Sequence, residues 1–353
     1  MTDWKSSMIQ SFEYYIVDPI TWKNISKIDN VISSTINWDL NAETIGSATI
    51  NINGNINECY IRIYLIIIQN DIKEKFPLGT FLVQTPSYKF DGRIQSTTLD
   101  AYTPLLELKE NYPPLGYSVM KDENIMDIAY RLTRENVRPP VIKTTNTQVV
   151  TDNFIANTNE TWLNFISYLL ESANYNFGLD ELGRILFLPK QNIQSLQPVW
   201  TYNDDNSSIL YPDLNIDRDL YGIPNVVEVI YSKGSTYYYG VAVNDDPNSP
   251  LSTINRGRKI TKRVTNPTIT GRPSRQEIEN HAKQLLKELS TLEYTVTYTH
   301  GYCPVRIGDC VRLNYSRAGL TNVKAKVINQ SIDCVPGCPV TEKAVFTTEL
   351  WGW

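Results

Sequence analysis

The sequence has 353 residues, and its 33 Lys and Arg against 38 Asp and Glu give a formal net charge of −5. With 41% hydrophobic and 20% charged residues, it has the composition of a globular chain long enough for about two or three domains. Binding nucleic acid over a whole surface needs an excess of basic residues, so the charge argues against that class. The start, Met1 to Lys5, lacks the pattern of a signal peptide, and the most apolar run, 60–68, is too short to span a bilayer. We therefore expect a protein made and folded in the cytoplasm, with no membrane segment.

Residues 1–112 predict a β-domain, a barrel or a sandwich. Apolar and polar residues alternate in its first runs, as in strands with one buried face, and a later run is apolar on both faces. The expected strands cover residues 33–40, 48–53, 59–68, 78–85 and 94–99. We expect Pro86 to end the fourth strand, and a short helix at 104–109.

Residues 113–200 predict a smaller α+β insert. Asp122 can cap a helix whose apolar residues recur at helical spacing. A second helix over 160–173 has Trp162 and Phe165 on its apolar face, and a hairpin over 175–189 turns at 180–183. A helix packed on a hairpin is the expected unit.

Residues 201–353 return to β-structure, with one helix at about 274–289. A capping box, Ser274 with Glu277, marks the start of this helix. The expected strands cover residues 225–231, 236–243, 292–298, 311–315, 323–332 and 344–351. The predicted fold class is thus a β-rich α+β protein, in which two β-rich domains flank a small α+β insert.

No catalytic constellation is recognisable in the sequence. There is no glycine-rich phosphate loop and no nucleophile elbow. The two histidines, His281 and His300, have no sequence neighbours that support a Ser-His-Asp or Cys-His arrangement, so we expect structural or surface roles for both. The pairs 204–205 and 245–246 lie in loops, where Asp usually serves turns. We predict a protein that is not an enzyme and assign no catalytic residue.

The cysteines are the strongest candidates for a site. Cys303, Cys310, Cys334 and Cys338 follow one another in the last sixth of the chain. A hairpin through 318–319 and a turn at 335–337 would bring three or four of these thiols to one end of a barrel. Four thiolates are the ligands of structural zinc or of an iron–sulfur cluster, although this spacing is not a standard one. One or two disulfides, or free thiols, remain alternatives.

The one concentrated group of positive charge is Arg256, Arg258, Lys259, Lys262 and Arg263. It suits contact with nucleic acid or an acidic partner, and equally a solvated segment or a subunit contact.

Several stretches, in this order, resemble the hub family of contractile phage tails and related injection machines, which includes late control protein D and prophage hub proteins. The resemblance is one of pattern and spans most of the chain beyond about residue 110. The stretches that carry it are residues 161–173, 180–189, 224–227, 246–252, 257–258 and 304–313.

The resemblance implies a homotrimer in which each chain supplies two barrels like those of tail-tube subunits. The trimer would join a hexameric tail tube or distal tail ring to the trimeric central spike, and its insert would face other baseplate components. Phage DNA would pass through its channel, and the protein would be part of the virion. Some tail-tip relatives of non-contractile phages hold an iron–sulfur cluster near their C-terminal end. The alternatives are such a tail-tip hub, the hub of a phage-tail-like bacteriocin, a tail protein associated with cell-wall binding or hydrolysis, or a metalloprotein whose cysteine site is redox-active.

Overall fold

The computed structural model describes residues 2–90, 92, 95–191, 193–206, 208–218, 221–233, 236–265, 267, 274–289 and 291–349. The chain divides into two compact units. The first comprises Met1–Leu214 and Thr297–Ala344, and the second comprises Asn215–Val296 and Val345–Trp353. The chain therefore passes between the units three times.

One large sheet dominates the described part of the chain, where thirteen strands belong to it. Its strand order is β13-β17-β20-β19-β3-β4-β7-β6-β5-β1-β2, and β18 pairs with both β12 and β19. The strands are β1 (Ile9–Val17), β2 (Asn24–Ile28), β3 (Val31–Asp39), β4 (Gly46–Asn53), β5 (Tyr60–Gln69), β6 (Ile72–Phe90), β7 (Gln95–Tyr102), β12 (Trp200–Asn203), β13 (Leu210–Arg218), β17 (Thr291–Gly301), β18 (Cys310–Tyr315), β19 (Leu320–Asp333) and β20 (Pro339–Glu349).

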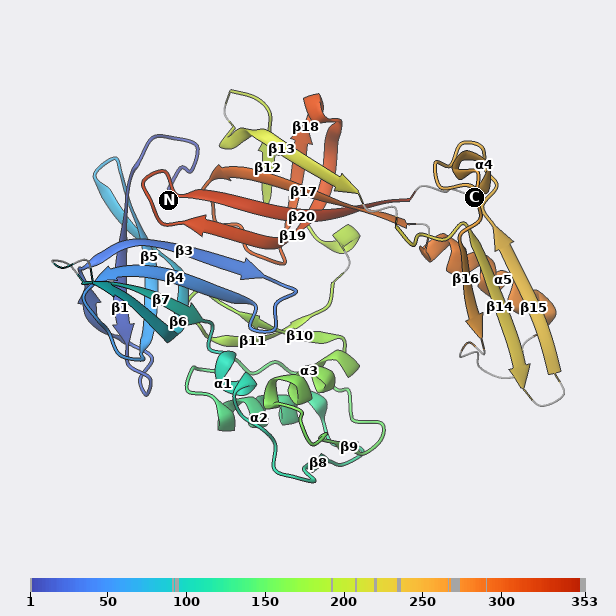
Figure 1. Ribbon diagram of the computed structural model, residues 1–353, viewed down its shortest axis with the longest axis horizontal. Helices are drawn as coiled ribbons and strands as arrows, with labels where there is room; N and C mark the ends of the chain where they lie inside the picture. The colour runs from blue at the N-terminus through green and yellow to red at the C-terminus, as the bar shows by residue number, and fades with distance from the viewer. Residues whose placement is uncertain are drawn as a thin grey trace. The chain divides into compact units, whose positions relative to one another are not determined.

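The pairing of β3 with β19 joins the beginning and the end of the chain inside the first unit (Figure 1). Ile36 lies opposite Ile332, and both belong to one apolar core with Val340. This shared core explains why the two compact units divide the chain differently from the predicted domains 1–112, 113–200 and 201–353. The division into three domains itself stays a prediction.

Strand β5 confirms the expectation of a strand covered on both faces, because its first eight residues are all buried. Strand β6 corrects the expectation that Pro86 ends a strand, since β6 continues to Phe90. Pro77 pairs only with β5 and Pro86 only with β7, so at each proline one edge of β6 has no strand partner. A proline lacks the N–H for a ladder and is tolerated at such an edge.

The residues of the predicted insert, 113–200, form short helices and strands, and their standing as a separate domain stays a prediction. These elements are β8 (Ser118–Val119), α2 (Ile125–Asn136), β9 (Phe154–Ile155), α3 (Trp162–Ser172), β10 (Tyr175–Leu179), β11 (Ile185–Pro189) and η1 (Ile193–Ser195). Before them, α1 (Leu106–Lys109) lies where a short helix is expected at 104–109. The predicted cap of α2 is wrong: Asn124, not Asp122, accepts the backbone N–H of Asp127, because Asp122 lies two residues before the cap in a left-handed conformation. Thr161 caps α3.

The turn between β10 and β11 fastens the insert to the large sheet. Arg62 is buried and donates to the carbonyl oxygen of Leu182 at 3.0 Å, and the indole of Trp22 donates to the same oxygen at 2.7 Å. Gly183, with φ +75°, fits closely, since an added Cβ would lie 2.8 Å from the side chain of Thr80. Only a glycine enters this conformation and this space without strain.

The second unit is a small sheet with a helix on one face. Its elements are β14 (Val226–Lys233), β15 (Thr236–Val243), α4 (Thr253–Arg256), β16 (Thr261–Thr265) and α5 (Arg275–Leu289). Helix α5 packs Ile278 and Leu286 against Val227 and Val229, as Figure 1 shows for the ribbon. The predicted capping box is confirmed: Ser274 N donates to Glu277 at 2.5 Å, and Glu277 N donates to Ser274 Oγ at 3.2 Å.

The predicted fold class is confirmed in its coarse form: the described chain is β-rich, with a large, mainly antiparallel sheet and few helices. The arrangement as two tube-like barrels stays a prediction. Of the predicted strands, Ile94 in 94–99 and both Leu350 and Trp351 in 344–351 lie outside the described residues, as do Gly234 and Pro273 beside other predicted elements.

Candidate functional site: a buried polar network

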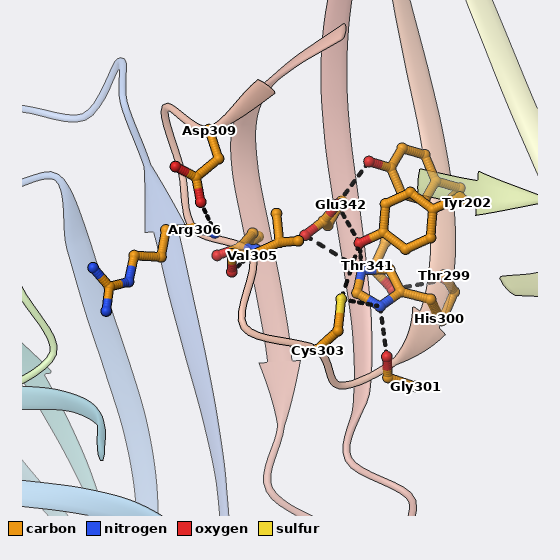
Figure 2. A network of polar contacts seen from close by, with 12 residues as sticks. Tyr202, Thr299, His300, Gly301, Cys303, Val305, Arg306, Asp309, Thr341 and Glu342 are labelled. Carbon is orange, nitrogen blue, oxygen red and sulfur yellow. Dashed lines mark hydrogen bonds and ion pairs between the residues drawn. The ribbon is translucent and has the colours of Figure 1, made fainter. Parts of the chain in front are cut away.

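A network of polar side chains lies inside the first unit, among strands from the last part of the chain (Figure 2). Strand β17 supplies two members, β12, β19 and β20 supply one each, and the loop after β17 supplies a thiol. All six are buried. They are Tyr202, Tyr298, His300, Cys303, Gln330 and Glu342.

Glu342 is the centre of this network. One carboxylate oxygen accepts from Tyr298 at 2.6 Å and from Tyr202 at 3.3 Å. The other accepts from Gln330 at 2.5 Å and lies 3.3 Å from Nε2 of His300. Burial opposes the charged carboxylate, but His300 and these donors outweigh it and hold the pKa of Glu342 below its usual value. A buried carboxylate with so many donors is fully satisfied.

His300 is the positive partner. Its Nδ1 lies 2.6 Å from the carbonyl oxygen of Gly301, which can only accept, so this nitrogen carries a proton. Nε2 faces the carboxylate of Glu342. Burial disfavours the charged ring, but the Glu342 carboxylate outweighs burial and raises the pKa of His300 to about 10. His300 and Glu342 therefore form a buried ion pair at neutral pH.

Cys303 completes the network: its Sγ lies 3.3 Å from the hydroxyl of Tyr202 and 3.9 Å from Nδ1 of His300. Sequence reasoning missed this grouping of a thiol, an imidazole and a carboxylate. The separation of only three residues between His300 and Cys303 was a signal, but the position of Glu342 depends on strand pairing. Because His300 and Glu342 are 0% exposed, a substrate has no access to them, and the arrangement is suited to holding strands together.

The four candidate thiols are all buried and free. Cys334 and Cys338 belong to the core of the first unit, Cys303 contacts Tyr202, and Cys310 lies opposite Lys326 in the β18–β19 pair. As expected, the Cys303 region runs beside the turn at 335–337 that leads to Cys338, since Tyr302 N donates to the carbonyl oxygen of Cys338. The hairpin at 318–319 is also confirmed.

The thiols do not fit a four-ligand centre in this arrangement. Burial raises the pKa of Cys334 to about 12 and raises those of Cys310 and Cys338, so without a metal these groups stay protonated thiols. Among the described residues, no three or more His, Cys, Asp or Glu are grouped so as to hold a metal ion. Zinc or an iron–sulfur cluster at Cys303, Cys310, Cys334 and Cys338 stays a prediction.

The other candidate residues form ordinary polar contacts. Asp246 accepts the backbone N–H of Asn248, as expected of a turn residue, whereas Asp204 accepts from the distant Ser316 at 3.0 Å. In the basic group, Arg263 pairs with Glu228 at 2.7 Å. Among the described residues, no helix combines the length and the apolar character that crossing a bilayer requires.

Comparison with known proteins identifies the fold. The chain is similar to the tail protein of Neisseria meningitidis MC58, with a TM-score of 0.64 and 12% identity over 96% of both chains. It is also similar to the 43 kDa tail protein of prophage MuSo2 from Shewanella oneidensis, with a TM-score of 0.62 and 10% identity over 95% of this chain and 98% of that one. A chain of the Francisella PdpA–VgrG complex matches with a TM-score of 0.57 and 10% identity, over 96% of this chain and 53% of that one.

No protein-family model and no curated protein matches the chain. The structural matches cover nearly the whole chain and both units. The chain therefore has the fold of phage tail proteins, which confirms, at the level of the fold, the resemblance to the phage-tail hub family that the sequence predicts.

Proposed function

We propose that this protein is the baseplate hub of a phage tail or of a phage-tail-like particle. It forms a homotrimer that joins the hexameric tail tube, or a distal tail ring, to the trimeric central spike. Other baseplate components bind around it, and phage DNA passes through its channel. Its place is the virion, after assembly in the cytoplasm of the host bacterium.

The observation that carries this proposal is similarity to two tail proteins over at least 95% of each chain. A match of this extent includes both compact units, so it concerns the whole architecture and not one common module. The buried site agrees with a structural role, because its ion pair lies out of reach of a substrate. The proposed role needs no catalytic residue.

The oligomeric mass of the purified full chain tests the trimer. Light scattering after size exclusion should give about three times the 40.4 kDa of one chain. Electron microscopy of the same fraction should show closed rings with a central opening, since the proposed channel must admit DNA. A dimer, or rings with another number of subunits, contradicts the proposal.

Because a hub can require its partners to assemble, a monomer calls for counting copies in the intact particle. Quantitative mass spectrometry of purified tails should find half as many copies of this chain per tail as one hexameric ring of the tube contains subunits. As many copies as one whole ring contains would identify the chain instead as a ring-forming tube or sheath-type subunit and would overturn the hub assignment.

We keep the predicted metal centre at Cys303, Cys310, Cys334 and Cys338 as a separate proposal, which requires these thiols to come together from the arrangement described above. Its test is elemental analysis and visible absorbance of anaerobically purified protein. Iron with visible absorbance, or one equivalent of zinc, would support a centre at the four cysteines. Five thiols that react with a thiol reagent after unfolding, Cys59 included, with no metal present, would contradict it. Serine substitution of Cys310 should abolish metal binding by a four-thiolate centre, because such a centre needs all four ligands.

A further inference from the structure

A chain of contacts leads out of the buried network toward the insert. Gln330 donates through the same amide nitrogen to Glu342 at 2.5 Å and to the carbonyl oxygen of Val305 at 2.9 Å. Val305 lies in the loop that follows Cys303. The network therefore holds this loop directly. Figure 2 shows Val305, Arg306 and Asp309 of the loop beside the network.

The loop is fixed along its whole length. Val305 N donates to the carbonyl oxygen of Cys303 at 2.8 Å, and Arg306 N donates to the side chain of Asp309 at 2.9 Å. Gly308 N donates to the carbonyl oxygen of Val327, on β19, at 2.7 Å. A loop with so many backbone bonds moves as one piece with the strand that holds it.

The side chain of Arg306 leaves this loop and forms an ion pair with Glu181. Glu181 belongs to the turn between β10 and β11. The carbonyl oxygen of the next residue, Leu182, accepts the hydrogen bonds from Arg62 and Trp22. The carbonyl oxygen of Glu181 itself accepts from Thr80. The turn is thus held from two sides, by the first strands of the sheet and by the loop at 303–309.

We propose that the loop 303–309 is a strut, which transmits the state of the buried Glu342 network to the turn at 180–183 and so sets the position of the insert. Disturbing the network loosens the turn, although no member of the network touches the insert turn itself among the contacts described. In a proposed hub, the insert would thereby respond to changes in the strands that carry the network. The strut itself does not depend on that function.

Hydrogen exchange measured by mass spectrometry on the full chain tests this proposal. The Tyr298→Phe variant removes one donor to Glu342 and keeps the ring. We expect peptides over residues 175–189 to exchange at least about threefold faster than in the parent. In the Arg306→Ala background the same substitution should produce no further acceleration, because the ion pair between Arg306 and Glu181 is already absent.

Two controls make the result specific. Thr299→Val alters the same strand on its opposite face, where Thr299 bonds with Thr341 at 3.0 Å, and should leave exchange over 175–189 unchanged. Arg317→Ala removes another surface ion pair, with Asp204, and should not abolish the effect of Tyr298→Phe. Gln330→Met, which removes the donor to Val305, replaces Tyr298→Phe if that variant does not fold.

The proposal is wrong if Tyr298→Phe and Gln330→Met both leave exchange over 175–189 unchanged. It is also wrong if either variant accelerates this exchange equally with and without Arg306, because loosening would then spread through the general core. Either result leaves the hub assignment untouched, since that assignment concerns assembly and is measured by mass and copy number.

Discussion

At the scale of single residues, the ion pair of His300 and Glu342 is the most demanding feature of the molecule. Both side chains are 0% exposed, so each charge has lost its water and depends on its partner and its hydrogen bonds. Removing one partner leaves the other charge buried and alone, which typically costs about 3–5 kcal/mol. The pair therefore makes stability depend on pH.

The first prediction concerns this dependence. Because the pKa of His300 is raised from 6.5 to about 10, its contribution to stability is complete below pH 6.5 and is lost as pH rises toward 10. At the acidic end, the pKa of Glu342 in the folded chain lies below its ordinary value of 4.5. The contribution of Glu342 to stability is therefore present above pH 4.5 and is lost as the pH falls through the lowered pKa. Urea unfolding should show the advantage of the parent over His300→Gln shrinking by about 2 kcal/mol between about pH 7 and about pH 8.5.

Thr299→Val is the matched control for this measurement, since it changes a neighbouring residue that does not titrate. Its difference from the parent should stay constant over the same range. A difference for His300→Gln that also stays constant would mean that His300 is neutral in the folded chain.

The second prediction concerns Gly183, which has φ +75° and lies against Thr80 and Trp22. Gly319 has nearly the same φ, +76°, but an added Cβ there meets nothing within 4 Å. Alanine at either position strains the left-handed backbone, which lowers the free energy of unfolding by about 1 kcal/mol. Only Gly183→Ala adds a clash, which lowers it by about 1–3 kcal/mol more. Chemical unfolding should therefore rank Gly183→Ala clearly below Gly319→Ala, and equal losses would show that the turn can move away.

At the scale of elements, helix α5 illustrates how local sequence sets a boundary. The reciprocal bonds of Ser274 and Glu277 satisfy two backbone donors that the first turn leaves free. Our third prediction is that Ser274→Ala weakens the helix by about 1 kcal/mol, seen as faster hydrogen exchange over its first turns. Asn280→Ala, in the middle of the same helix, should not, because alanine is the better helix former.

Most individual elements could be predicted from the sequence, because their patterns are local. The apolar face of α3, the turn before Arg184 and the capping box of α5 are readable within about fifteen residues. What could not be predicted is pairing between distant strands, such as β3 with β19 or the parallel pair β12 and β18. The buried site depends on that pairing, since Tyr202, His300 and Glu342 come from three separate strands. Hence its two-charge centre was invisible in the sequence.

At the scale of the whole molecule, the second unit has its own small core under α5. Our fourth prediction is that Leu286→Ala destabilises this unit by about 2–5 kcal/mol. Scanning calorimetry should show one transition moving to lower temperature while the other stays in place, as expected of two compact units.

Leu289→Ala is the matched control, because Leu289 lies in the same helix but is 37% exposed. It should shift the transition much less. If Leu286→Ala moves a single transition of the entire chain, the two units unfold together, and the division has no thermodynamic meaning.

The pairing of β3 with β19 has a consequence for synthesis on the ribosome. The partner of Asp39 is Asn329, which is synthesised about 290 residues later. At about 5–20 residues per second, translation of these residues takes roughly 15–60 s. During that time one edge of β3 has no partner from its own chain, and an open strand edge can capture another molecule. The protein must therefore pass through a nascent state exposed to aggregation, and slower translation late in the message would lengthen it.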